Sequence, residues 1–190
     1  RTLLRLAACA TVALLSGVAL AANPQVELDT SMGKIRVELY PDAAPKTVAN
    51  FLQYVKDGYY NGTQFHRVIP GFMAQGGGYG ADYRQKPMRP PVAIESEQSV
   101  KAGLSNGVGT IAMARTGDPN SATTQFFINV ADNKKLDFTA ATAQGYGYTV
   151  FGKVVEGMDV VNKIVNTPTG PGGPFPADVP KEKLMINSAK

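Results

Sequence analysis

Polar and apolar residues alternate strictly over positions 34–39, where every second residue is isoleucine, valine or leucine. A period of two places the apolar side chains on one face of a β-strand, so this segment predicts a half-buried strand. Val26 and Leu28 precede it with the same spacing, and the glycine-containing segment 31–33 between the two runs is typical of a turn. The two runs therefore predict an antiparallel hairpin.

A helix is predicted from Pro45, because apolar residues follow at helical intervals at Val48, Phe51, Leu52 and Val55. Proline suits the first helical turn, where its missing N–H group would have no partner. Gly58 follows the last apolar residue and predicts the end of the helix. The same spacing of apolar residues predicts a second helix over 157–166.

Short apolar runs between turn residues predict further strands at 64–69, 73–76, 92–95, 109–115, 125–130, 149–155 and 184–187. Segment 168–180 contains five prolines and is expected to form a loop rather than a helix. Many short strands with only two helices favour a mainly β fold. We expect a largely antiparallel sheet, closed as a barrel or packed as a sandwich, with helices covering its ends.

The first 21 residues are predicted to be a secretory signal peptide, which leaves 22–190 as a single domain. Two arginines in the first five residues precede an apolar run, and positions 19–21 (Ala-Leu-Ala) form a small-residue cleavage site. The run is too short for a membrane-spanning helix. A lipid on Cys9 is less well supported, because most of the apolar run follows that cysteine instead of preceding it.

Charge and cysteine content narrow the possible partners. The chain has 19 Lys and Arg against 15 Asp and Glu, a net charge of +4, which falls to +2 when the two leader arginines are removed. No dense basic stripe is present, so neither nucleic acid nor a membrane surface is expected as a partner after cleavage. The single cysteine, Cys9, lies in the leader, so the processed chain would contain no disulfide and no thiol nucleophile.

Patterns typical of serine hydrolases, metal sites and dinucleotide-binding loops were sought in the sequence, and each lacks a feature that its chemistry requires. Positions 103–107 match the G-x-S-x-G pattern of serine hydrolases, but a predicted strand follows where a helix is needed, and the only histidine, His66, lies upstream. One histidine and no close group of acidic residues give no metal site. The glycines at 76–80 lack the spacing of a dinucleotide-binding loop. No metal and no other cofactor is therefore predicted.

Arg67 stands inside an apolar run, which is unusual for an unpaired cation. With a period of two, Arg67 would share one face of its strand with Phe65 and Ile69, and His66 would point the other way with Val68.

Segment 125–130 divides in a similar way, with three apolar residues on its core face and Gln125, Phe127 and Asn129 on the opposite face. Two interpretations remain open at this point. The outward residues and Arg67 could line an exposed apolar groove with a few polar anchors. Alternatively, Arg67 could be buried in a structural ion pair, with Phe127 covered by a loop.

Four segments in order, 65–77, 109–114, 124–128 and 150–154, resemble motifs of the cyclophilin family, and the resemblance extends over roughly 26–165. It implies an eight-stranded antiparallel barrel capped by two helices, with a substrate groove on the outside of the barrel. It also implies peptidyl-prolyl cis-trans isomerase activity. Together with the predicted leader, the chain resembles the bacterial periplasmic members, so we expect it in the periplasm.

Matching these motifs residue by residue implies a set of site residues. The family's catalytic arginine is matched by Arg67. The pocket for the proline ring is matched by Phe72, Met73, Phe127 and Leu136. The polar groups that hold the substrate backbone are matched by Gln75 and Gln125. The strand end that pairs with the substrate main chain is matched by Ala114 and Arg115, and a histidine of many eukaryotic members is replaced by Tyr148.

The chain departs from human-type members at the edge of this groove. Lys135 stands where those members have tryptophan, Arg115 replaces an asparagine, and segment 138–148 differs. These changes are expected to alter ligand selectivity more than catalysis. His66 is interpreted as a supporting residue rather than a catalytic one.

The resemblance implies proline-containing peptides and unfolded exported proteins as partners of a monomeric enzyme. A second hypothesis is a non-catalytic binding module or periplasmic holdase that uses the same groove. A third is a structural exported protein in which all these residues are core. Arg67 favours the enzyme, because a cation in an apolar cleft costs desolvation that binding alone does not require.

Overall fold

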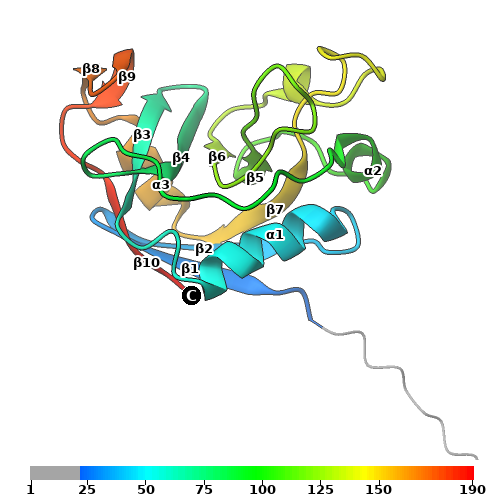
Figure 1. Ribbon diagram of the computed structural model, residues 1–190, viewed down its shortest axis with the longest axis horizontal. Helices are drawn as coiled ribbons and strands as arrows, with labels where there is room; N and C mark the ends of the chain where they lie inside the picture. The colour runs from blue at the N-terminus through cyan, green and yellow to red at the C-terminus, as the bar shows by residue number, and fades with distance from the viewer. Residues whose placement is uncertain (1–21) are drawn as a thin grey trace, which may run out of the picture.

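The computed structural model describes residues 22–190; the predicted signal peptide and the alternative lipid site on Cys9 lie outside the described residues. The strands are β1 Gln25–Thr30, β2 Gly33–Leu39, β3 Thr63–Ile69, β4 Met73–Gly80, β5 Thr110–Met113, β6 Phe126–Asn129, β7 Val150–Glu156, β8 Thr169–Gly172, β9 Phe175–Pro180 and β10 Met185–Ala189. Eight of them close an antiparallel barrel in the order β1-β10-β3-β4-β6-β5-β7-β2 (Figure 1), which confirms the expected barrel.

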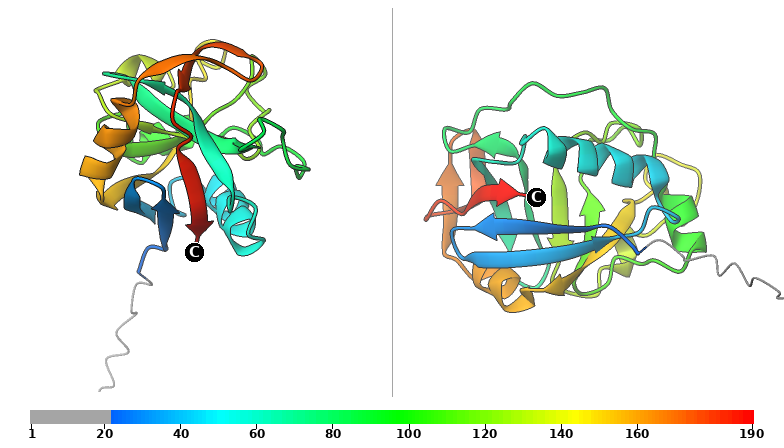
Figure 2. Two further views of the ribbon diagram at one scale, coloured as in Figure 1. Left: turned by 90° about the vertical axis from the view of Figure 1, so that its left-hand side faces the viewer. Right: turned by 90° about the horizontal axis from the view of Figure 1, so that it is seen from below.

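Two helices cover the barrel, as predicted. They are α1, Pro45–Lys56, and α3, Met158–Val165, and Figure 2 shows them on opposite sides of the barrel. Pro45 occupies the first turn of α1, and Gly58 follows its end with a φ of +66°. Both helices place apolar side chains in the barrel core. No helix within residues 22–190 is long and apolar enough to cross a membrane.

The prediction of a strand at 92–95 is wrong, and a third helix, α2 (Ser96–Lys101), follows this segment. Only Val92 makes a single bridge, to Ala122. The reason is Glu95, whose carboxylate turns inward and accepts hydrogen bonds from the backbone N–H groups of Lys46 (3.0 Å) and Thr47 (2.8 Å). The first N–H groups of α1 would otherwise lack partners, so this long-range cap takes precedence over strand pairing.

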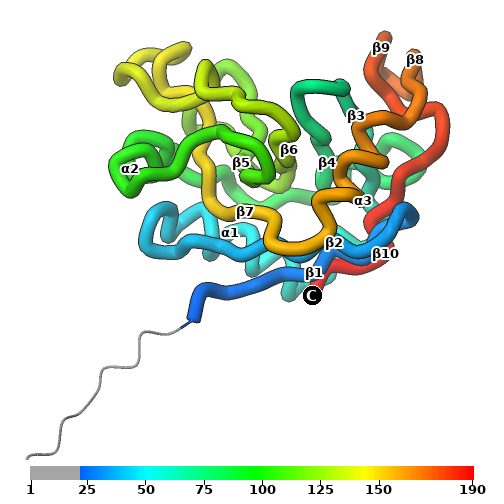
Figure 3. The backbone as a smooth tube through the Cα atoms, turned by 180° about the vertical axis from the view of Figure 1, so that it is seen from behind, coloured from blue at the N-terminus to red at the C-terminus, as the bar shows by residue number. Residues whose placement is uncertain are grey.

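The prediction of a loop at 168–180 is also wrong, because this proline-rich segment forms the β8–β9 hairpin. Its strands pair Gly170 with Val179 and Gly172 with Phe175, and Gly173 makes the turn with a φ of +52°. Both strands of a two-stranded hairpin are edge strands, where the missing N–H group of proline is tolerated. Figures 1 and 3 show the hairpin beside β3 from opposite sides of the molecule.

Two apolar clusters lie on opposite faces of the barrel wall. The larger cluster fills the barrel and includes Phe51, Phe126 and Phe151, with the Phe51 ring 5.7 Å and 5.2 Å from the other two. The smaller cluster consists of Met73, Ala112, Phe127 and Val150. Because Phe126 and Phe127 are neighbours on β6, their side chains point to opposite faces, and the smaller cluster lies outside the barrel.

Candidate functional site

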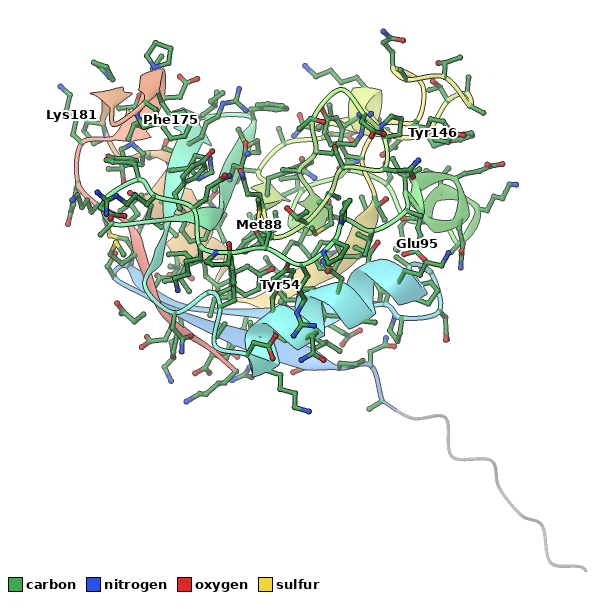
Figure 4. All side chains as sticks on the ribbon, viewed as in Figure 1. Tyr54, Met88, Glu95, Tyr146, Phe175 and Lys181 are labelled. Carbon is green, nitrogen blue, oxygen red and sulfur yellow. The ribbon has the colours of Figure 1, made fainter. Side chains whose placement is uncertain are left out.

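A groove of about 360 Å³ lies over the smaller cluster, on the outside of the barrel wall. All ten residues that sequence reasoning selected line it: Arg67, Phe72, Met73, Gln75, Ala114, Arg115, Gln125, Phe127, Leu136 and Tyr148. Its walls come from two distant segments, the β8–β9 hairpin and the loop 137–148 that follows the short 3₁₀ helix η1 (Lys134–Leu136). Phe175 and Tyr146, labelled in Figure 4, belong to these two segments.

A β-bulge in β3 decides where Arg67 points. Phe65 pairs with Gly76 and Arg67 pairs with Gln75, so β3 uses one extra residue, His66, between two successive partners. The predicted alternation therefore fails at this position. Phe65 and Val68 both enter the barrel core, while Arg67 lies on the outer face. The expectation that Phe65 and Arg67 share a face is wrong because simple alternation does not include the bulge.

Polar contacts orient the guanidinium of Arg67 along the groove. Its Nη1 donates to Oε1 of Gln75 at 3.4 Å, and Nε2 of Gln75 donates to Oε1 of Gln125 at 3.0 Å. On the other side, Nε of Arg67 lies 3.8 Å from Oδ2 of Asp178. The Arg67 side chain is 43% exposed, so the interpretation as a buried arginine in a structural ion pair is wrong.

Gly78 leaves space for the hydrogen-bonded side chains of Gln75 and Gln125. A Cβ atom on Gly78 would collide with Cγ of Gln125, so only glycine lets that side chain lie across β4 toward Gln75. The glycine run after Gln75 thus has a packing role that the sequence analysis did not assign.

The floor of the groove is apolar and closely packed. Phe127 is 5% exposed, and its ring packs nearly perpendicular to the Tyr148 ring, at a centroid distance of 5.6 Å and an interplanar angle of 82°. Met73 packs in the same cluster, with Phe72 and Leu136 partly exposed at its border. The floor therefore offers an apolar surface on which a small saturated ring could pack.

The strand end after β5, Ala114 and Arg115, lines the groove. The N–H of Ala114 donates to the carbonyl of Gln125 at 3.0 Å, but within the described residues the N–H of Arg115 has no hydrogen-bond partner. The Arg115 side chain turns away to the loop 137–148, where its Nε donates to the carbonyl of Gly147 at 2.7 Å. A peptide in the groove could pair with the free main-chain group.

Sequence reasoning missed two lining residues of the groove, Tyr79 and Phe175, which form an aromatic cluster with His66. The His66 ring lies 4.6 Å from that of Tyr79 and 5.2 Å from that of Phe175. Phe175 and Asp178 were missed because their segment was expected to be a loop. The one aromatic residue among the prolines of 168–180 was the available signal.

His66 itself is 3% exposed. Burial, followed by the neighbouring charge of Arg67, lowers the pKa of His66 to about 4. The imidazole is therefore neutral near pH 7 and packs as an aromatic wall beside Arg67.

Comparisons with known proteins agree with this arrangement. The family described as cyclophilin type peptidyl-prolyl cis-trans isomerase/CLD matches residues 25–190. A peptidyl-prolyl cis-trans isomerase of Acinetobacter baylyi is 50% identical over 169 residues, covering 89% of this chain and 86% of that protein. Peptidyl-prolyl cis-trans isomerase B of Escherichia coli is also 50% identical, over 163 residues, covering 86% and 96%.

A crystal structure of a cyclophilin type peptidyl-prolyl cis-trans isomerase of Cryptosporidium parvum is similar in fold. It has a TM-score of 0.67 at 27% identity and covers 87% of this chain and 94% of that one. The barrel, the groove and the matched family together establish that the chain belongs to the cyclophilin-type peptidyl-prolyl cis-trans isomerases.

Proposed function

We propose that this enzyme catalyses cis-trans isomerisation of X-Pro bonds in exported proteins in the periplasm, and that Arg67 stabilises the twisted amide. The observation that carries the mechanism is the position of the Arg67 guanidinium. It lies on the outer face of β3, oriented by Gln75, beside an apolar floor. A cation and an apolar pocket in one groove are the two features that this reaction needs.

The electronics of the peptide bond explain why no covalent chemistry is required. Rotation about a peptide bond costs about 18–20 kcal/mol because the C–N bond has partial double-bond character. In the twisted state the nitrogen becomes pyramidal and recovers its lone pair. A donor aimed at that lone pair stabilises the twisted state more than either planar state, which is the requirement for catalysis. A 10⁵-fold acceleration would require about 7 kcal/mol.

Each group around Arg67 has a separate part in this mechanism. The guanidinium group of arginine is always charged, planar and rich in N–H donors. Arg67 can therefore keep its hydrogen bond to Gln75 and still donate to the substrate. Phe127 and Met73 would hold the proline ring and exclude water from one side of the amide. The free N–H of Arg115 would hold the substrate main chain while the bond turns.

An isomerisation assay on residues 22–190 separates this proposal from a non-catalytic holdase. An X-Pro bond isomerises unaided in roughly 10–100 s, so catalysis is visible as a faster approach to equilibrium. We expect acceleration that scales with protein concentration in a protease-coupled assay on a short proline peptide. Binding of the peptide without any acceleration would support the holdase instead.

Export gives a second prediction. The leader pattern at 19–21 predicts cleavage after Ala21, so the protein isolated from cells should begin at Ala22 and fractionate with the periplasm. N-terminal sequencing of the fractionated protein measures this directly. A protein that retains Arg1, or one that carries lipid on Cys9, would contradict it.

Cyclosporin, a cyclic peptide inhibitor of many cyclophilins, is expected to bind weakly here and more tightly to Lys135→Trp. The Lys135 ammonium lies 5.4 Å from the centre of the Phe72 ring, where an apolar macrocycle would have to bury it. Tryptophan would replace that strongly hydrated charge with an aromatic face and an N–H donor.

We therefore expect Lys135→Trp to lower the inhibition constant by at least about tenfold, which corresponds to about 1.4 kcal/mol. Titration of isomerase activity with cyclosporin measures both proteins, with Lys134→Trp as the control at a neighbouring exposed lysine. Equal and tight inhibition of the unmodified protein would show that Lys135 does not obstruct the inhibitor.

A further inference from the structure

The groove continues past the proline pocket into a second hollow of about 510 Å³. Arg115, Leu136 and Tyr148 line both spaces, so the two are continuous. The rest of the lining of this second hollow comes from Lys135, from Thr116 and Gly117, and from Ala143, Gln144 and Gly147. A peptide with its proline in the first space would therefore place neighbouring residues of the same chain over the second.

The second hollow is positively charged and has no neutralising group in its lining. Arg115 and Lys135 are its only charged lining residues. None of the ion pairs that the structure describes in residues 22–190 includes either of them. Arg67, by contrast, has the Asp178 carboxylate at 3.8 Å.

Three carboxylates lie close in the sequence to lining residues of the hollow, those of Asp118, Asp132 and Asp137, but none of them lines it. Asp137 accepts hydrogen bonds from the hydroxyl of Ser105 at 2.6 Å and from the backbone N–H of Asn106 at 2.7 Å. Asp132 pairs with Lys134 at 3.3 Å. The neutral donors leave the charge of Asp137 in place, but neither Asp137 nor Asp132 lines the hollow or pairs with its two cations.

Arg115 is held in a fixed orientation by neutral partners. Its three nitrogens donate to the carbonyls of Gly147 (2.7 Å), Thr116 (2.8 Å) and Ala143 (3.2 Å), and its guanidinium stacks over Tyr148 at 4.9 Å. Since a guanidinium has five N–H donors, two remain for a ligand. Carbonyl partners orient the group but leave its charge in place, so it is prepared to accept a carboxylate.

We propose that this cationic hollow selects substrates that carry a glutamate or aspartate side chain near the proline, on one side of it. The inference rests on the proposed isomerase function and adds a specificity to it. The guanidinium of Arg115, held in place by its carbonyl partners, and the ammonium of Lys135, on a flexible side chain, would together bind the carboxylate. Because both cations are partly solvated, the preference should be moderate and sensitive to salt.

The test is a peptide series measured by protease-free NMR exchange. Each peptide contains one X-Pro bond and differs only by Glu or Gln at the second or third position before or after the proline. We expect the Glu peptide to have a kcat/KM roughly three- to tenfold above its Gln partner on one side of the proline. This ratio should decline as the salt concentration rises, because salt screens exposed charges.

Lys135→Gln should lower the Glu-to-Gln ratio, and Lys135→Glu should reverse it. The matched control is Lys56→Gln, which removes an equal charge from an exposed lysine of α1 that lines neither space and belongs to none of the described ion pairs, and it should keep the ratio. A ratio near one at every position, or a ratio that Lys135→Glu leaves unchanged, would overturn the proposal while the turnover of Gln peptides still supports the isomerase. No turnover of any peptide would overturn both.

Discussion

Replacing Arg67 with alanine is expected to lower kcat/KM for X-Pro isomerisation by roughly 10²–10³-fold, or about 2.7–4 kcal/mol, the usual cost of removing one electrostatic anchor. The loss should be in kcat more than in KM, because in the proposed mechanism the guanidinium interacts mainly with the twisted amide. The side chain is 43% exposed and lies outside the barrel core, so the substitution should leave folding intact. The protease-coupled assay measures the activity, and thermal unfolding measures the fold.

Two further variants separate the role of the positive charge of Arg67 from that of its guanidinium shape, and control for effects of removing any exposed arginine. Arg67→Lys keeps a positive charge but loses the planar fork that contacts Gln75, so its activity should fall between the wild type and the alanine variant. Arg84→Ala is the matched control, because Arg84 is an arginine outside the groove with a side chain that is 88% exposed. Near-normal activity of Arg67→Ala would remove Arg67 from the mechanism, and an equal loss in Arg84→Ala would show that the effect is not local.

The sequence predicted the regular parts of the fold because local patterns determine them. Strict alternation over 34–39 and the opposite faces of 125–130 both follow from the two-residue period of a strand, and the structure confirms them. Alternation failed in β3, where His66 is an extra residue in a bulge. It failed again before α2, where Glu95 caps a helix that begins some 50 residues earlier in the chain. The spacing of apolar residues within one segment does not reveal a bulge or a contact with a distant segment.

The residues of the site also fall into those that the sequence predicted and those that it did not. Seven of its ten residues lie in the four segments that resemble the family's motifs, and the other three, Arg115, Leu136 and Tyr148, were matched by their position beyond those segments. Phe175 and Asp178 come from a proline-rich segment that gave no strand signal, and only tertiary packing brings them to Arg67 and His66. The hairpin is therefore the part of the groove for which the structure was required.

Stability should decrease between about pH 6.5 and pH 4 because of His66, the only histidine in the chain. Burial lowers its pKa from 6.5 to about 4 in the folded state, so the unfolded chain binds a proton in this range that the folded chain does not. Stability then rises with pH across this range, is fully present above pH 6.5 and is lost as the pH falls toward 4. At 1.36 kcal/mol for each pH unit, the full contribution is about 3 kcal/mol.

The two carboxylates with lowered pKa values titrate below this pH range. Glu27, paired with Lys34, and Asp57, paired with Arg89, have lowered pKa values, so their contributions are lost only below pH 4.5 and pH 3.8 respectively. The interval between pH 7.5 and pH 5 therefore isolates His66 from these carboxylates.

Urea unfolding at pH 7.5 and pH 5 provides the measurement. The wild type should lose about 2 kcal/mol of unfolding free energy between these two values, which is 1.36 kcal/mol for each pH unit below 6.5. His66→Phe keeps an aromatic ring between Tyr79 and Phe175 but cannot titrate, so its stability should change little over the same interval. His66→Gln controls for loss of the ring while also removing the proton site. If both variants lost as much stability as the wild type, the acid sensitivity would arise elsewhere, and His66 would not be the buried neutral group that forms this wall of the groove.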